Sequence, residues 1–214
     1  MTQLNKTTAP ALPWASTDYE RTYQDQFNKV LRLYFNQIDT TLGAVVGRNG
    51  GRYIDCPNGV FFDTADQTIP LANTAYPVVY TQTYLNNAVA LQAGSTSKIE
   101  ISIGGVYNFQ FSGQLESTNS SAKDVFLWIR RNGIDIGYSS RAYSLSGSST
   151  YAPIAYSFDI DMGVGEYLEL MISASATTVQ LAADTAVSPH PGIPSSVMSV
   201  NFIAPLPDPR PVAP

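Results

Sequence analysis

One stretch of the sequence decides the fold class: Gly105-Val106-Tyr107-Asn108-Phe109-Gln110-Phe111-Ser112. Its aromatic residues alternate with other residues, which is the period-two pattern of a β-strand with one buried and one solvated face. Upstream, the segment 99–103 alternates in the same way. Downstream, the apolar run 125–129 leads to Asn132-Gly133, a pair that favours tight hairpin turns, and the same pair at Asn58-Gly59 predicts a second tight turn. The central part of the chain is therefore expected to form antiparallel strands.

Four further segments with a strand pattern follow, at 154–160, 167–172, 178–181 and 197–203. Their spacing of about ten residues, without a helical pattern between them, favours a sandwich over a βαβ fold. We predict a mainly β protein, an antiparallel jelly-roll sandwich preceded by one N-terminal amphipathic α-helix and an extended arm. The expected units are the arm and helix at 1–47, a linker with the first short strands at 48–94, the jelly-roll head at 95–204 and a Pro-rich tail at 205–214.

The helical pattern begins at Thr17, because Thr17-Asp18-Tyr19-Glu20 has the spacing of a capping box, and it is expected to end at Gly43 and Gly47. Apolar residues between these points form two adjacent seams, which would let one helix contact two neighbours in a three-helix bundle. The alternative is that this face lies on the protein's own β domain. The expected anchoring and trimerisation residues are Tyr19, Tyr23, Phe27, Val30, Leu31, Tyr34, Phe35 and Ile38.

The C-terminal half, residues 105–203, resembles the trimeric jelly roll of the tumour necrosis factor and complement globular-head superfamily. The stretch at 105–112 looks like that family's G-x-Y-x-F strand, and 125–133 resembles the strand and hairpin that follow. Gly163-Val164-Gly165-Glu166-Tyr167-Leu168-Glu169-Leu170 is similar to the family's G-x-G-D-x-L-x-L segment, with Glu166-Tyr167 in place of the usual Asp-x pair. The resemblance implies a homotrimer that buries aromatic side chains along a threefold axis.

Residues 18–37 resemble the opening helix of virion structural proteins from tailed phages, particularly those of marine bacteria and cyanobacteria. The resemblance rests on Asp18-Tyr19-Glu20-Arg21-Thr22-Tyr23-Gln24-Asp25-Gln26-Phe27 and on Val30-Leu31-Arg32-Leu33-Tyr34-Phe35-Asn36-Gln37. In such proteins a helix near the start is joined to a variable β head. The resemblance implies an anchor and a displayed domain, and it leaves the particle component open.

Two surfaces of the head are candidates for contact. The run 125–129 is apolar on both strand faces, and only one face can enter the core of a sandwich, so a neighbouring subunit would cover the other. The expected interface residues of the head are Tyr107, Phe109, Phe111, Phe126 and Trp128. The segment 138–151 has the Ser, Gly and Tyr content of adaptable binding loops, and its candidate ligand residues are Tyr138, Arg141, Tyr143 and Tyr151.

Composition argues against several other functions. The net charge is −5 and only 14% of residues are charged, so nucleic-acid binding is not expected. No apolar run has the length of a membrane span. His190 is expected in a surface turn, Cys56 as a buried thiol, and neither a metal nor a cofactor is expected. Asp159 and Asp161 share a strand face, which leaves a calcium site or a hydrolytic acid pair as alternatives to solvated charges.

These features predict a bacteriophage virion structural protein without enzymatic activity, made in the host cytoplasm. It would be displayed as a homotrimer on the particle exterior, as a capsid decoration protein or a short tail fibre. Its partners would be copies of itself, capsid, neck or tail proteins, and a host cell-surface glycan. The alternatives are a glycan-binding adhesin of the tail and a polysaccharide depolymerase.

Overall fold

The chain forms two units, Met1–Asp55 with one helix and Cys56–Pro214 with two β-sheets. The computed structural model describes residues 10–12, 17–18, 20–46, 56–147 and 150–206. In the segment predicted as a linker with the first short strands, 48–94, the described residues form five short strands, and from Cys56 onward the segment belongs to the second unit. Phe61 and Val89, both in this segment, have no exposed surface and belong to the core of the β unit.

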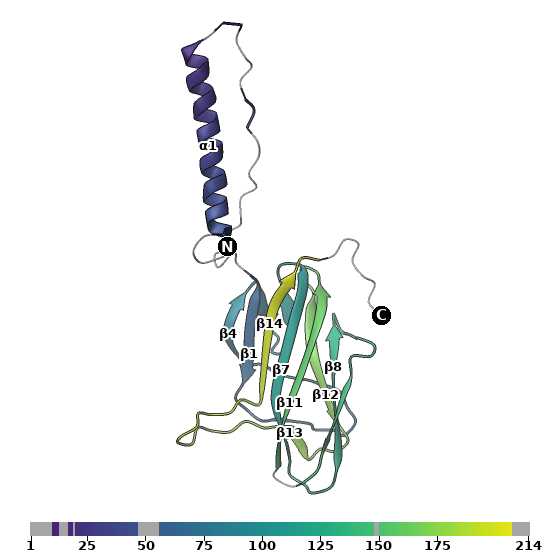
Figure 1. Ribbon diagram of the computed structural model, residues 1–214. Helices are drawn as coiled ribbons and strands as arrows, with labels where there is room; N and C mark the ends of the chain where they lie inside the picture. Colours follow the sequence, from purple (N-terminus) through teal and green to yellow (C-terminus); the bar gives the residue numbers. More distant parts are fainter. Residues whose placement is uncertain (1–9, 13–16, 19, 47–55, 148–149, 207–214) are drawn as a thin grey trace. The chain divides into compact units, whose positions relative to one another are not determined.

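The helix α1 spans Arg21–Val46 (Figure 1). The carbonyl of Glu20 accepts the first helical hydrogen bond from the backbone N–H of Gln24 at 3.1 Å, so Glu20 rather than Thr17 caps the helix. The predicted capping box is therefore wrong in position, although the predicted helix is confirmed. Gly43 lies inside α1 rather than at its end, and Gly47 lies outside the described residues.

All strand pairs in the two sheets are antiparallel. Sheet A consists of β2 (Gln67–Thr68), β13 (Val179–Leu181), β7 (Gly105–Ser117), β14 (Ser196–Ala204), β1 (Asn58–Asp63) and β4 (Gln82–Asn87), with β11 (Thr150–Met162) on the other edge of β7. Sheet B consists of β10 (Arg141–Leu145), β8 (Lys123–Arg131), β12 (Tyr167–Ala174), β6 (Ile99–Ile101) and β5 (Val89–Leu91), with β3 (Tyr76–Pro77) beside β12 and β9 (Ile134–Asp135) beside β8.

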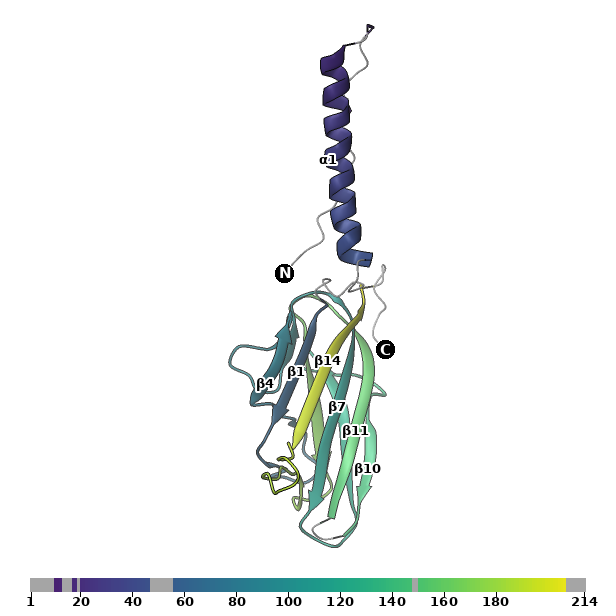
Figure 2. The same ribbon diagram turned by 60° about the vertical axis from the view of Figure 1, so that its left-hand side comes forward.

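The order of the main strands is that of a jelly roll, which confirms the predicted fold class. Taken along the chain, β1, β7, β11 and β14 lie in sheet A, whereas β6, β8, β10 and β12 lie in sheet B. The chain thus crosses between the sheets repeatedly, and β14 returns to lie between β1 and β7 (Figures 1 and 2). Two such antiparallel sheets face each other across one core.

Alternation along the strands builds most of the core. In β7 the residues from Gly105 to Ser112 alternate between buried and more exposed positions, and β8 alternates from Lys123 to Arg130. The inward residues from both sheets form a single apolar cluster. The β unit therefore completes its own core with its own strands.

Two predicted turns have different outcomes. Asn132 and Gly133 join β8 to β9 with φ angles of 50° and 82°, which confirms the predicted two-residue hairpin turn. Asn58 and Gly59 instead lie in β1. A Cβ atom on Gly59 would lie 2.8 Å from the ring of Phe61, so this glycine allows close packing within a strand.

Candidate functional site

The first candidate surface is the apolar arc of α1, defined as the side chains of Tyr23, Phe27, Val30, Leu31, Tyr34, Phe35, Ile38 and Leu42. At about 100° per residue these side chains span an arc of roughly 140° around the helix axis. The five charged residues of the helix, Arg21, Asp25, Lys29, Arg32 and Asp39, all project from the opposite side. Every described side chain of α1, from residue 21 to residue 43, keeps part of its surface exposed. Tyr19, also predicted to belong to this surface, lies outside the described residues.

The half-exposed residues of α1 follow a heptad spacing. Gln24, Phe27, Leu31, Tyr34, Ile38 and Thr41 are separated by alternating steps of three and four, and all are partly covered. The rings of Tyr23 and Phe27 stack at 6.3 Å between centroids, on the border of this seam. Phe35, 56% exposed, and Leu42, 52% exposed, lie on the other border. The arc therefore has a central seam and two apolar flanks.

Three of the five aromatic residues predicted at the head interface are core residues, so the prediction is wrong for them. Tyr107 and Phe109 have no exposed surface, and Phe111 is 2% exposed. Phe109 stacks on Phe158 of β11 at 5.3 Å with nearly parallel rings. The alternation in β7 is satisfied by the chain's own second sheet, which leaves these side chains inaccessible to another subunit.

Phe126 and Trp128 behave differently, because they lie on the outer face of sheet B. Phe126 is 39% exposed and Trp128 is partly buried. Ala142 of β10 lies opposite Phe126, and Met171 of β12 lies opposite Trp128. Met171 is only 1% exposed, so we call Phe126, Trp128 and Ala142 the outer patch; the structure keeps Phe126 and Trp128 as candidates for contact with a neighbour.

An ion pair borders the outer patch. Arg130 Nε donates to Asp135 Oδ1 at 2.8 Å across the β8–β9 hairpin. This hydrogen bond, together with one from the side chain of Trp128, holds the pKa of the Asp135 carboxyl below its usual range.

The four residues predicted to form one ligand loop are not gathered in a loop. Tyr138 lies in the turn after β9 and is 100% exposed, with a φ of 59°. Arg141 and Tyr143 lie on β10, and Tyr143 Oη donates to the carbonyl of Ala155 at 2.7 Å. Tyr151 lies on β11, and the charge of Asp184 raises the pKa of its hydroxyl. Residues 141–145 and 150–151 pair with neighbouring strands, so the four residues do not share one loop, and their role in ligand binding stays a prediction.

The remaining candidate side chains, His190, Asp159 and Asp161, each interact with other groups of the chain and do not form a common site. His190 is exposed in a turn, as predicted, and its Nδ1 lies 3.1 Å from the carbonyl oxygen of Pro191. Asp159 accepts a hydrogen bond from Asn108 at 2.6 Å, and Asp161 lies 3.4 Å from a guanidinium nitrogen of Arg131. Among the described residues, no three of His, Cys, Asp or Glu are grouped so as to hold a metal ion.

The prediction of a buried thiol is wrong. Cys56 is exposed, at the point where the β unit begins. The buried neighbour at this point is Pro57, and the backbone carbonyl of Cys56 accepts hydrogen bonds from the side chains of Asn58 and Asn87.

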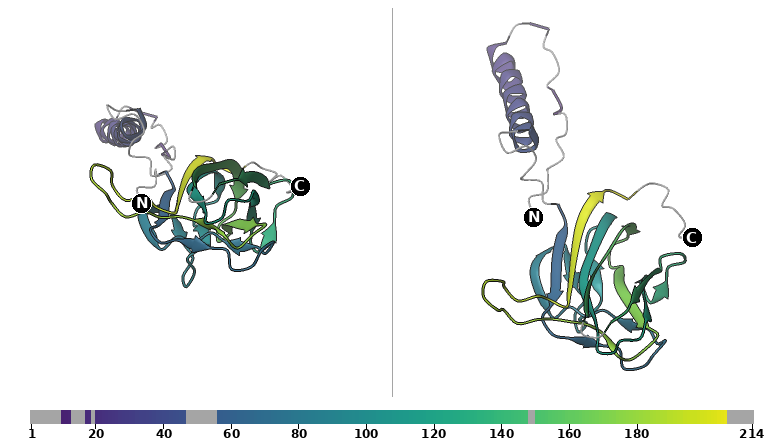
Figure 3. Two further views of the ribbon diagram at one scale, coloured as in Figure 1. Left: turned by 90° about the horizontal axis from the view of Figure 1, so that it is seen from below. Right: turned by 60° about the horizontal axis from the view of Figure 1, so that its bottom comes forward.

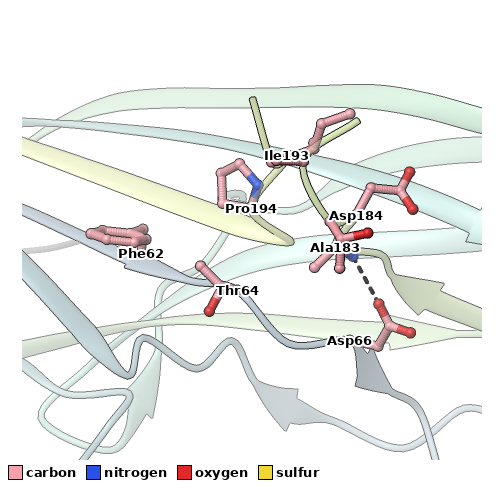
Figure 4. Close-up of a pocket in the computed structure, with 10 residues that line it drawn as sticks. Phe62, Thr64, Asp66, Ala183, Asp184, Ile193 and Pro194 are labelled. Carbon is pink, nitrogen blue, oxygen red and sulfur yellow. Dashed lines mark hydrogen bonds between the residues drawn. The ribbon is translucent and has the colours of Figure 1, made fainter. Parts of the chain in front are cut away.

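The sequence analysis missed one pocket, of about 640 Å³, at the end of β1. One wall is the segment from Phe62 to Asp66, and the other is the long loop at 182–195, which extends away from the sandwich (Figure 3). Asp184, Ile193 and Pro194 complete the lining (Figure 4). The two walls are far apart in the sequence. The only feature of the sequence that marked this region was the predicted turn around His190.

The fold and these surfaces define the class: a jelly-roll β-sandwich protein that carries an N-terminal amphipathic helix. No protein-family model matches the chain, and no curated protein matches it either. Among solved structures, the globular domain of zebrafish complement 1qA protein is similar, with 16% sequence identity and a TM-score of 0.43 over 70% of this chain and 98% of that chain. None of the helices formed by the described residues has the length and apolar character needed to cross a membrane.

Proposed function

We propose that this chain is a structural protein without enzymatic activity that assembles as a homotrimer through α1 and displays the jelly-roll head. The observation that carries the proposal is the apolar arc, an unburied surface along most of a 26-residue helix. Isolated helices are marginal in water and depend on packing of the apolar face. Since the β unit completes its core without α1, another surface must cover the arc.

Copies of the same helix suit that surface. A single heptad seam covers only a narrow stripe of a helix, whereas the arc spans roughly 140°. Two neighbouring helices, one against each flank of the seam, would cover it, and that arrangement is a three-helix bundle. The charged residues would then face solvent, where Arg21 and Asp25 already lie within 3.9 Å of each other.

We further propose that the trimer belongs to the exterior of a bacteriophage particle, as a capsid decoration protein or a short tail fibre. The support is the resemblance of residues 18–37 to the opening helices of tailed-phage virion proteins. The structure also separates a helical unit from a self-contained head, as an anchored and displayed protein requires. A depolymerase is the weaker alternative, because Asp159 and Asp161 already have protein partners.

The assembly is tested by light scattering of the full chain and of two matched variants. The wild type should have a mass of about 70 kDa, three times the 23.2 kDa of one chain. Ile38→Asp places a charge in the seam and should shift the mass to that of the monomer, because a buried unpaired charge is costly. Asn36→Asp introduces the same residue on the opposite side and should leave the trimer intact. A wild-type monomer, or equal behaviour of the two variants, would refute the proposed assembly.

The virion location is tested separately by immunogold electron microscopy of intact particles. Label over the shell would identify a decoration protein, and label restricted to the tail would identify a fibre. Particles that carry none of the protein would contradict the proposed location while leaving the trimer untouched.

A further inference from the structure

The pocket at the end of β1 has rigid walls. Backbone hydrogen bonds of 2.9 Å run in both directions between Asp184 and Ile193 and close the base of the loop at 182–195. Asp66 Oδ1 accepts a hydrogen bond from the backbone N–H of Ala183 at 2.8 Å, which ties the loop to the segment that follows β1 (Figure 4). The N–H of Ser195 donates to the carbonyl of Asp63 at 3.0 Å at the other end of the same wall. A site fixed in this way loses little entropy when a ligand binds.

The volume of about 640 Å³ lies within the range of roughly 300–1,000 Å³ that is typical of small-ligand sites. The lining combines Phe62, Ile193 and Pro194, which are apolar, with the hydroxyl of Thr64 and the carboxylates of Asp66 and Asp184. Such a mixture suits a ligand that has both an apolar face and several hydroxyl groups.

The charges of the residues that line the pocket limit which class of ligand can bind there. None of the ten described residues that line it is Lys, Arg or His. The charges of Asp184, which lines the pocket, and of Glu116 raise the pKa of Tyr151. The local potential is therefore negative, and an anionic ligand would be repelled.

The carboxylates of the pocket can accept further hydrogen bonds. Asp66 accepts from the backbone N–H of Ala183 through one oxygen and from Gln180 Nε2 at 3.4 Å through the other. Each carboxylate oxygen has further lone pairs, which can accept the hydrogen of a hydroxyl group on a neutral ligand.

We propose that this pocket binds a neutral sugar, with Asp184 and Asp66 accepting hydrogen bonds from its hydroxyls and Phe62 contacting the apolar face of its ring. This site lies at a different place from the loop at 138–151, and it does not depend on trimerisation. It would give the displayed head a recognition function in addition to its structural role.

The test is saturation-transfer NMR on the full chain. The neutral probes are D-glucose, D-galactose, D-mannose and N-acetyl-D-glucosamine; the anionic probes are N-acetylneuraminic acid and D-glucuronic acid, and putrescine serves as a cationic probe. Saturation should reach the ring protons of at least one neutral sugar. The anionic sugars should give none, and saturation of putrescine without any neutral sugar would show binding driven by charge alone.

Two variants and one control localise the binding. Asp184→Asn keeps the shape and removes the charge, and it should weaken binding of the neutral sugar about tenfold or more, as expected for loss of a hydrogen bond to a charged group. Ala186→Trp should abolish binding by filling the pocket. Asp124→Asn removes an exposed carboxylate from sheet B and should change nothing.

Three results would overturn the inference: no neutral sugar bound, binding that survives in both pocket variants, or binding of only a charged probe. Light scattering on the same samples reports assembly independently. A failure of sugar binding in an intact trimer therefore counts against the pocket alone, and a monomer that binds sugar counts against the proposed assembly alone.

Discussion

Replacing Phe109 and Phe126 separately by alanine discriminates between a core residue and a surface residue on two strands that are consecutive in the chain but lie in opposite sheets. Phe109 has no exposed surface and stacks on Phe158, so Phe109→Ala leaves a cavity between the sheets. Such a change lowers the free energy of unfolding by about 3–5 kcal/mol. Phe126 is 39% exposed on the outer patch, so Phe126→Ala should cost only about 1–2 kcal/mol, because part of its ring is already in contact with solvent.

The measurement is urea unfolding of the full chain, followed by circular dichroism at two protein concentrations. The difference between Phe109→Ala and the wild type should be the same at both concentrations, because the lost contacts lie within one chain. The slope of the transition should also be unchanged, so that the midpoint alone reports stability. Equal losses for the two variants, or a Phe109→Ala effect that varies with concentration, would refute the assignment of Phe109 to the core.

Two further predictions concern packing and charge. Gly105→Ala should lower the thermal midpoint of the head, because the new Cβ atom would lie 2.3 Å from the ring of Phe202. Gly104→Ala should have a smaller effect in the same melting experiment, because the nearest neighbour of its Cβ atom is the end of the Leu206 side chain at 3.0 Å. Asp135 has a lowered pKa in the folded protein, so its stabilising contribution is present above the ordinary aspartate pKa of about 3.9 and is lost as the pH falls through the lower folded value. The difference in thermal midpoint between wild type and Asp135→Asn should therefore shrink from pH 7 to pH 3. It should be small at both pH values, because Arg130 and Asp135 are both partly solvated. A difference that does not change with pH would contradict the ion pair.

The sequence predicts those features that depend on local periodicity. The alternation in β7 and the turn at Asn132-Gly133 identify strands and their connection, because a period of two and positive φ angles leave a direct mark on residue choice. The same alternation does not reveal what buries the apolar face. For Tyr107 and Phe109 the second sheet of the same chain does so, and the inference of a neighbouring subunit was wrong.

Features made by distant segments were beyond the sequence pattern. The strand β10 was missed because Arg141–Leu145 has no run of apolar residues, and pairing with β8 stabilises it. The pocket joins Thr64 and Asp66 to Asp184 only after β14 has returned beside β1. A position such as Gly59 was interpreted as a turn, because the ring of Phe61 that packs on it cannot be seen in the sequence.

Because three of the predicted interface aromatics are buried, the proposed trimer would have to be held together by the helix rather than by the head. A phenylalanine can bury roughly 150–250 Å², so the exposed 39% of Phe126 amounts to less than about 100 Å². The outer patch alone therefore falls far below the roughly 800 Å² per partner of a stable interface. The 26-residue helix is about 39 Å long, and a contact strip about 10 Å wide against each of two neighbours supplies roughly 800 Å² per chain. A trimer held in this way should dissociate when the seam is disrupted at Ile38 and should persist when Phe126 is truncated.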